Sequence, residues 1–324
     1  MNGVIVIDKS AGWTSHDVVN RMRRILQQRS VGHLGTLDPL ATGVLPLVTG
    51  SLTRLAQFYT TSEKSYDGVI RFGFATNTYD ADGEPLGDVC AVVPSLANLQ
   101  NLAAEFLGHI EQVPPPFSAK KIKGIPAYKL ARKEKEVILK PVQVEVKEFV
   151  ITSAEADRAH FRARVSSGTY LRSIAHEMGQ RLGCGAHLES LRRTSVAEFD
   201  LTQAHTMEEI EAQGKGIEVE QPVAVWGGHS CPPLSPQSMP ALHSQLSPGL
   251  ESLFVHPRQL LPQIPSVTAD EGTAARIRSG RPVNLPELSR ARQVKVFFGQ
   301  SELIAIATRV AGTLFHPKIV FPPG

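Results

Sequence analysis

A run rich in serine, proline, glycine and histidine constrains the fold of this chain more than any other feature of its sequence. The run extends from Trp226 to Leu250. Such a composition is typical of a linker or of a loop outside a packed core. We therefore predict two folded units, residues 1–225 and residues 263–324, joined by a linker at 226–262.

The composition fits a folded protein that works in a reducing compartment. Hydrophobic residues make up 42% of the 324 residues and charged residues 20%, enough apolar side chains for a core and too few charges for a disordered chain. The three cysteines are far apart and no histidine pair has metal-ligand spacing, so we expect free thiols and no metal site. We see no basic leader and no run near the ~20 apolar residues of a membrane span, so we expect a cytoplasmic protein with no membrane partner.

The spacing of apolar residues predicts an α+β fold for the first unit. A capping box at Thr14–Asp17 marks the start of a helix, and further helices are expected at 96–107 and 170–182. Alternating or β-branched runs predict strands at 3–7, 66–74, 142–151 and 160–165. In the second unit we expect one helix at 270–279 and strands at 294–298 and 303–308, so this small unit should be mostly β.

One glycine-rich segment, Gly32-His-Leu-Gly-Thr-Leu-Asp-Pro-Leu-Ala-Thr-Gly43, places a carboxylate on a stiff loop. Pro39 fixes its own φ and keeps Asp38 out of the helical region. The glycines permit a tight path and the close approach of a ligand. Taken as a dipeptide, Asp38-Pro39 would equally suit a turn or a helix start, with the aspartate as the capping residue.

The whole segment decides between these interpretations, because it resembles the signature of the TruB-type pseudouridine synthases. Their aspartate lies in Gly-x-Leu-Asp-Pro-x-Ala-x-Gly, and this chain has Gly-Thr-Leu-Asp-Pro-Leu-Ala-Thr-Gly. The likeness continues in order from Gly3 to about Phe199. It implies a catalytic domain with a mixed, largely antiparallel sheet flanked by helices, followed by a PUA-like C-terminal domain.

The resemblance also implies a reaction, that of a tRNA pseudouridine(55) synthase. Such an enzyme flips a uridine out of the tRNA T-loop, breaks its N1–C1′ bond and joins C5 to C1′. The isomerisation neither gains nor loses atoms and involves no net redox change, so no cofactor is required. The sequence has no dinucleotide fingerprint or phosphate-binding loop, which fits that expectation.

Three residues carry the expected chemistry. Asp38 would stabilise or attack the sugar as positive character develops on it, as a carboxylate does in glycoside hydrolysis. Arg172 follows a Gly-Thr-Tyr run at a helix start, where the helix dipole disfavours a cation, so it should have a partner; the resemblance implies that this partner is Asp38. Tyr66, in Lys64-Ser-Tyr66-Asp, matches the family's active-site tyrosine and would stack on the base.

Other residues are expected to contact the RNA. The resemblance assigns His33 to the space left by the flipped base and places Asp80 in a block near the active site, while Tyr170 would line the pocket or simply pack. A basic insert at about 114–137 resembles the family segment that closes over RNA. Within it, residues 117–135 include six lysines and one arginine but only one glutamate. The residues expected to meet phosphates are Lys120, Lys121, Lys123, Lys129, Arg132 and Lys133.

Three alternatives remain open at this point. A related enzyme could depend on a guide RNA and partner proteins, although the basic insert favours a stand-alone monomer. An RNA-binding protein or tRNA-folding chaperone would not need the set Asp38, Tyr66 and Arg172. A glycosidase would need a second carboxylate as the acid, and the Asp38 segment offers none. One departure from the family is Ser10, which follows Lys9 where the family usually has proline.

The basic insert generates a first prediction. If it engages six phosphates, the logarithm of the RNA association constant should fall with the logarithm of salt concentration, with a slope of roughly −4 to −5. Titrations of a T-stem-loop RNA at several salt concentrations measure this slope. An affinity that hardly depends on salt would argue against an RNA-contacting insert.

Overall fold

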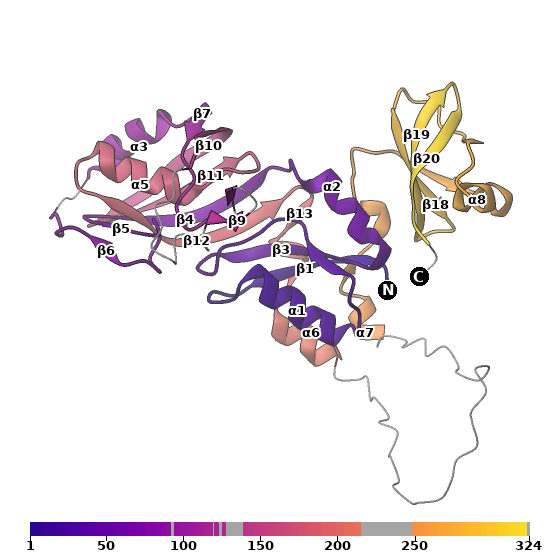
Figure 1. The fold of residues 1–324 in the computed structure, drawn as a ribbon, viewed down its shortest axis with the longest axis horizontal. Helices are drawn as coiled ribbons and strands as arrows, with labels where there is room; N and C mark the ends of the chain where they lie inside the picture. The colour runs from indigo at the N-terminus through magenta and orange to yellow at the C-terminus, as the bar shows by residue number, and fades with distance from the viewer. Residues whose placement is uncertain (92–93, 119, 123–124, 128–138, 215–247, 323–324) are drawn as a thin grey trace, which may run out of the picture.

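The fold is α+β, as predicted, with a small β unit at the C-terminus. The computed structural model describes residues 1–324 except 92–93, 119, 123–124, 128–138, 215–247 and 323–324, and for 121–122 and 125–126 it describes the backbone alone. Figure 1 shows a large body built on one long sheet, and the C-terminal unit as a separate lobe beside it. Among the helices of the described residues, none is long and apolar enough to span a membrane.

The large sheet runs through the whole body in the order β14-β1-β3-β12-β4-β11-β10-β7, and β2, β13 and β15 pair with strands along it. Its neighbours are parallel at β1–β14 and β3–β12 and antiparallel in the other pairs, so the sheet is mixed and largely antiparallel, as expected. The strands are β1 (Gly3–Lys9), β2 (Val31–His33), β3 (Thr42–Thr49), β4 (Lys64–Phe72), β7 (Gly108–Gln112), β10 (Val142–Glu155), β11 (Arg158–Val165), β12 (Ala186–Val196), β13 (Phe199–Asp200), β14 (Ala204–His205) and β15 (Phe254–Val255).

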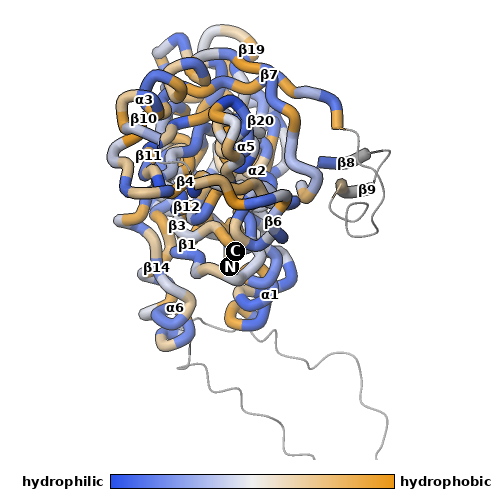
Figure 2. The backbone as a smooth tube through the Cα atoms, turned by 90° about the vertical axis from the view of Figure 1, so that its left-hand side faces the viewer, coloured by the Kyte–Doolittle hydropathy of each residue, from blue (hydrophilic) through white to orange (hydrophobic). Residues whose placement is uncertain are grey.

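Helices cover one face of this sheet. The apolar sides of α1 (Ser15–Ile25), α3 (Leu96–Ala104), α5 (Leu171–Arg181) and α6 (Met207–Gly214) pack into one core with the sheet. The start of α1 is fixed locally, because the Thr14 and Asp17 side chains each accept a hydrogen bond from the other's backbone N–H. Figure 2 shows hydrophilic and hydrophobic residues mixed along α1, as expected of an amphipathic helix.

The other face of β1 belongs to a second core, which extends as far as the C-terminal unit. Side chains alternate along a strand, so Ile5 and Ile7 join the helix-covered core, whereas Val4 and Val6 join a second core. That second core also contains Phe297 and other apolar residues of the C-terminal sheet. β1 is therefore covered on both sides, which explains why its sequence is a continuous apolar run.

The C-terminal unit is a five-stranded sheet in the order β16-β18-β19-β20-β17, with one helix packed on it. Its predicted helix and both predicted strands are present. The elements are β16 (Ser266–Ala269), α8 (Glu271–Arg278), β17 (Val283–Asn284), β18 (Gln293–Phe298), β19 (Glu302–Ala311) and β20 (Leu314–Val320).

The end of the predicted linker is folded. Residues 248–262 form α7 (Pro248–Glu251), β15 and the 3-10 turn η3 (Pro257–Gln259). β15 pairs antiparallel with β1 through Val255 opposite Val4. The prediction of a linker as far as residue 262 was therefore wrong for this part. A strand of two residues has too little periodic signal to be recognised in the sequence, and it is ordered by pairing with β1.

The remaining described elements are short. β5 (Ala75–Thr76) pairs with β6 (Pro85–Leu86), and β8 (Lys121–Ile122) pairs with β9 (Ile125–Pro126) inside the basic insert. Two further 3-10 turns and one helical turn link the strands of the body: η1 (Gly50–Leu55), α2 (Ala56–Tyr59) and η2 (Leu201–Gln203).

A polar contact joins the body to the segment that leads into the C-terminal unit. Glu198 accepts one hydrogen bond from the Tyr59 hydroxyl at 2.6 Å and another from the Leu261 backbone N–H at 2.7 Å. Just before Leu261, the Leu260 and Arg258 carbonyls of the same segment accept from the Lys295 ammonium of β18, at 2.6 and 3.0 Å. The segment is thus held by a carboxylate on one side and an ammonium on the other.

This junction generates a stability prediction. Replacing Glu198 with alanine leaves two partly buried donors without an acceptor, so we expect a loss of about 2 kcal/mol in the free energy of unfolding. Glu155→Ala, which removes an exposed carboxylate at the end of β10, is the matched control. Urea denaturation measures both, and equal midpoints for the two variants would show that the junction contributes nothing.

Candidate active site

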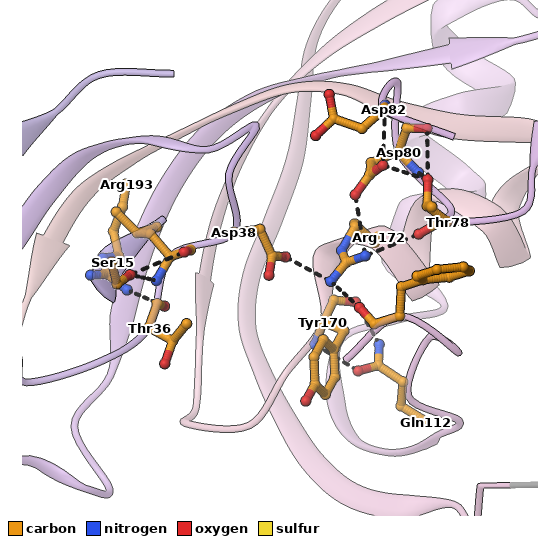
Figure 3. Close-up of polar contacts among 12 residues, drawn as sticks. Ser15, Thr36, Asp38, Thr78, Asp80, Asp82, Gln112, Tyr170, Arg172 and Arg193 are labelled. Atoms are coloured by element: carbon orange, nitrogen blue, oxygen red, sulfur yellow. Dashed lines mark hydrogen bonds and ion pairs between the residues drawn. The ribbon is translucent and has the colours of Figure 1, made fainter. Parts of the chain in front are cut away.

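The loop that carries Asp38 is fixed on both sides of the aspartate, as Figure 3 shows in part. Before Asp38, the Ser15 hydroxyl at the start of α1 accepts from the Leu37 N–H at 2.8 Å and lies 3.1 Å from the Leu37 carbonyl. After Asp38, the Pro39 carbonyl accepts from the Gly12 N–H at 2.9 Å and from the Lys9 ammonium at 3.2 Å. The loop backbone is therefore immobilised, while 40% of the Asp38 side chain stays exposed.

Arg172 meets Asp38 across the cleft. It is the second residue of α5, and its Nη2 lies 2.8 Å from Asp38 Oδ2. The same guanidinium donates to the Thr78 carbonyl at 3.0 Å and to the Phe117 carbonyl at 3.1 Å. A cation in the first turn of a helix does have a partner here, as the dipole argument required.

A second carboxylate holds Arg172 from behind. Asp80 Oδ2 lies 3.2 Å from Arg172 Nη1, and only 7% of the Asp80 side chain is exposed. Its other oxygen accepts from the Thr78 hydroxyl at 2.5 Å and from the Asp82 N–H at 3.2 Å. Figure 3 shows Asp38 and Asp80 on opposite sides of the guanidinium. Asp80 therefore orients Arg172, which is the supporting role that the sequence left open beside a contact with RNA.

Arg193 is a functional residue that the sequence analysis missed. It lies on β12 and is fully buried. Its guanidinium donates to the Gly35 carbonyl at 3.0 Å, the Thr36 carbonyl at 3.1 Å and the Val44 carbonyl at 2.8 Å, so it fastens the Asp38 loop to the centre of the sheet. No local pattern distinguishes it from Arg192, and its partners lie about 150 residues earlier in the chain.

Gly43 allows β3 and β12 to approach closely beside this loop. Its φ is +96°, and a Cβ there would lie 2.2 Å from the Arg193 carbonyl oxygen. Because that contact is with backbone, any other residue would force the two strands apart. The last glycine of the motif is thus required by the packing of the sheet centre.

A cleft of about 390 Å³ opens beside Asp38. Tyr66, Tyr59 and Tyr170 line it, together with His33 and Lys64. Burial raises the pKa of Tyr66, and burial is also the main cause of the raised pKa of Tyr170, so both phenols are neutral near pH 7. Burial, with Arg193 and His16 nearby, lowers the pKa of His33, which favours the neutral imidazole.

Comparison with known proteins gives the chain its family. The model of the TruB family pseudouridylate synthase N-terminal domain matches residues 23–171, and the model of the tRNA pseudouridylate synthase B C-terminal domain matches residues 172–221. A protein of Solibacter usitatus named tRNA pseudouridine synthase B is 46% identical over 99% of this chain and 100% of its own length. A protein of the same name from Stutzerimonas stutzeri is 34% identical over 94% of this chain and 91% of its own.

The chain belongs to the TruB family of pseudouridylate synthases. The resemblance seen in the Asp38 motif is therefore confirmed. Two solved structures share the fold: an H/ACA ribonucleoprotein bound to a substrate RNA (TM-score 0.66, 21% identity) and a Cbf5-Nop10-Gar1 complex (TM-score 0.65, 24% identity). Each likeness covers 99% of this chain and 85% of the solved chain.

Within this TruB-family site, most of the residues expected to act together do lie together. Asp38, Tyr66, Arg172, Tyr170 and His33 all line the one cleft. Lys120 is exposed at the edge of the basic insert, and the backbone of Lys121 forms part of β8. The side chain of Lys121 and the whole of Lys123, Lys129, Arg132 and Lys133 lie outside the described residues, so their expected contacts with phosphate stay predictions.

Arg193 generates the prediction for this site. Arg193→Met removes the donor from two loop carbonyls and from the Val44 carbonyl of β3. We expect a loss of about 3–5 kcal/mol in the free energy of unfolding, because a hydrogen bond to a charged group contributes ~1.5–3 kcal/mol. Arg192→Met is the matched control: the neighbouring arginine pairs with Asp8 at 2.7 Å near the surface, so it should cost less than about 1 kcal/mol. Thermal and urea unfolding compare them, and a smaller loss for Arg193→Met than for Arg192→Met would contradict the anchoring role.

Proposed function

We propose that this protein isomerises the T-loop uridine of tRNA to pseudouridine, with Asp38 as the essential carboxylate. The observation that carries this proposal is an exposed carboxylate at the wall of a cleft, 2.8 Å from a buried guanidinium. The relatives from Solibacter usitatus and Stutzerimonas stutzeri, which match nearly the whole chain, are both named tRNA pseudouridine synthase B.

The arrangement suits the cleavage of a glycosidic bond. As the N1–C1′ bond breaks, positive character develops on the ribose, and a carboxylate beside it stabilises that charge. In this position Asp38 could attack C1′ or remove a proton from the sugar. An arginine stays charged at neutral pH, so Arg172 pairs with the ionised carboxylate and fixes its direction. The uracil then turns, C5 bonds to C1′ and gives up its proton, and N1 takes up a proton, so overall no atom is gained or lost.

The aromatic side chains suit a flipped base. Tyr66 is neutral and lines the cleft, where its ring could stack on uracil for ~1–3 kcal/mol. Tyr170 also lines the cleft, and its backbone N–H and carbonyl are both bound by the Gln112 side chain, at 2.7 and 3.0 Å. Flipping costs a few kcal/mol. We propose that neutral His33, at the cleft edge, fills the space that the base leaves.

The remaining assignments are part of the same proposal. The basic insert at about 114–137 would contact the phosphates of the T-stem-loop, and the protein would act as a monomer in the cytoplasm without a guide RNA. Residues 1–225 would form the catalytic domain, and residues 263–324 a PUA-like domain. The full-length match to relatives named as tRNA enzymes supports the stand-alone reading.

The decisive experiment incubates the purified chain alone with a T-stem-loop RNA and maps pseudouridine. Wild type should convert the T-loop uridine without a partner, and Asp38→Asn, which keeps the shape and removes the charge, should lower kcat by about a thousandfold or more. RNA binding should survive in this variant. Asp67→Asn, which neutralises an exposed aspartate on β4 that pairs with Arg162, is the control and should remain active.

Other outcomes would point elsewhere. Near-normal turnover by Asp38→Asn would remove the assigned role. Activity only after guide RNA and partner proteins are added would contradict the stand-alone proposal, and release of free uracil would indicate a glycosidase.

A further inference from the structure

Lys64 is a cation in the cleft that the proposed chemistry does not use. It begins β4, two residues before Tyr66, and lines the cleft with Asp38. Its side chain lies over Gly35 of the Asp38 loop, where a Cβ on the glycine would come 3.3 Å from Lys64 Cε. The end of the Lys64 side chain therefore packs against the loop that carries Asp38.

The other cations around this loop have structural partners within the protein. Arg172 pairs with two carboxylates, and Arg193 donates to three carbonyls. Lys9 is buried and donates to the carbonyls of Ser10, Trp13 and Pro39 at 2.9, 2.7 and 3.2 Å. Each of these three side chains therefore holds parts of the protein together.

Lys64 differs from them in its partners. Its Nζ donates to the Ser62 carbonyl at 2.7 Å, and within the part of the chain that the structure describes no carboxylate pairs with it. An ammonium has three N–H donors, so two remain for a ligand. Burial, together with the nearby Arg193 guanidinium, lowers the pKa of Lys64 to about 8. A half-buried ammonium in this environment is stabilised by an anion that enters the cleft.

We propose that Lys64 binds a phosphodiester of the RNA, one of the two that flank the flipped uridine. The proposal rests on the function proposed above. A nucleotide whose C1′ reaches Asp38 brings its own 5′ phosphate and the phosphate of the next nucleotide to the cleft. Lys64 supplies a compact point charge for one of them, while Arg172 stays committed to the carboxylates.

The charges around Lys64 fit a negative ligand. The ionisable side chains that line the cleft with it are His33, Asp38, Tyr59, Tyr66, Tyr170 and Arg172. The three phenols and the imidazole are neutral near pH 7, because burial raises the pKa of each tyrosine and lowers that of His33. The one carboxylate, Asp38, is paired with Arg172, and Arg193 adds a further positive charge beneath the loop. The lining described here is therefore positive around Lys64.

The test uses T-stem-loop RNAs that carry a single uncharged methylphosphonate linkage, either 5′ or 3′ of the target uridine. One of the two should lower kcat/KM of the wild-type protein about ten- to a hundredfold, as expected for the loss of a charge-assisted hydrogen bond. Lys64→Met should lose a similar factor on natural RNA and lose little more on that modified RNA, because the two changes remove the same contact. Lys64→Arg should keep most of the activity.

Lys318→Met, which removes an exposed lysine from β20, is the control and should still respond to the modified RNA. The salt dependence of RNA binding adds a measurement that a purely structural lysine would not change. For Lys64→Met, the slope of the logarithm of the association constant against the logarithm of salt concentration should be less steep by about 0.7–0.9, which corresponds to one phosphate contact. A wild-type protein that is active but indifferent to both modified RNAs overturns the Lys64 proposal. A wild-type protein that makes no pseudouridine overturns the proposed function instead.

The pH profile separates phosphate binding from a role in proton transfer. Only the charged ammonium binds phosphate, so KM should be lowest below about pH 8 and rise as pH increases through 8 toward 9, and Lys64→Arg should flatten this rise. A kcat that instead increases through pH 8, and no longer does so in Lys64→Arg, would make Lys64 a general base and overturn the proposal.

Discussion

The site depends on one guanidinium held between two carboxylates. Arg172 reaches Asp38 on its exposed side and Asp80 on its buried side. A single ion pair with a partly exposed aspartate would leave the arginine free to follow solvent or ligand. The second carboxylate, with the carbonyls of Thr78 and Phe117, fixes the guanidinium, so Asp38 meets a partner that cannot move away. The position of the exposed carboxylate is thus determined by groups that never touch the substrate.

The Asp38 loop has a matching support beneath it. Arg193 donates to two loop carbonyls that precede Asp38. Ser15 binds the loop at Leu37, and Lys9 binds it at Pro39. Burying an arginine is costly unless its donors are satisfied, and here carbonyls of the loop and of β3 satisfy them. The buried Lys9 ammonium is likewise satisfied by carbonyls, in the turn after β1. In this turn the chain has Ser10 in place of the proline usual in the family. Hydrogen bonds to an ammonium therefore help to fix a turn in which the ring of proline is missing.

The sequence predicted features that depend on residues close together in the chain, and it missed features that depend on distant partners. The start of α1 could be predicted because the Thr14 and Asp17 side chains bind each other's backbone N–H within one turn. The strand β1 could be predicted because its apolar run is continuous. Asp38 and Arg172 were found through the family motif and the unfavourable place of a cation in a first helical turn. Arg193 and the task of Asp80 could not be read, since each depends on partners far away in the chain. The strand β15 was missed because its order comes from β1 and not from its own two residues.

The burial of β1 on both faces bears on where the catalytic part of the protein ends. Val4, Val6, Val44 and Val48 belong to a core to which residues after position 250 contribute, and β15 pairs with β1. A protein cut back to residue 225 would expose this apolar surface to water and free the backbone groups of β1 that now bind β15. The sheet that carries the active site is therefore a joint product of both ends of the chain, and the smallest autonomous enzyme is close to the whole polypeptide.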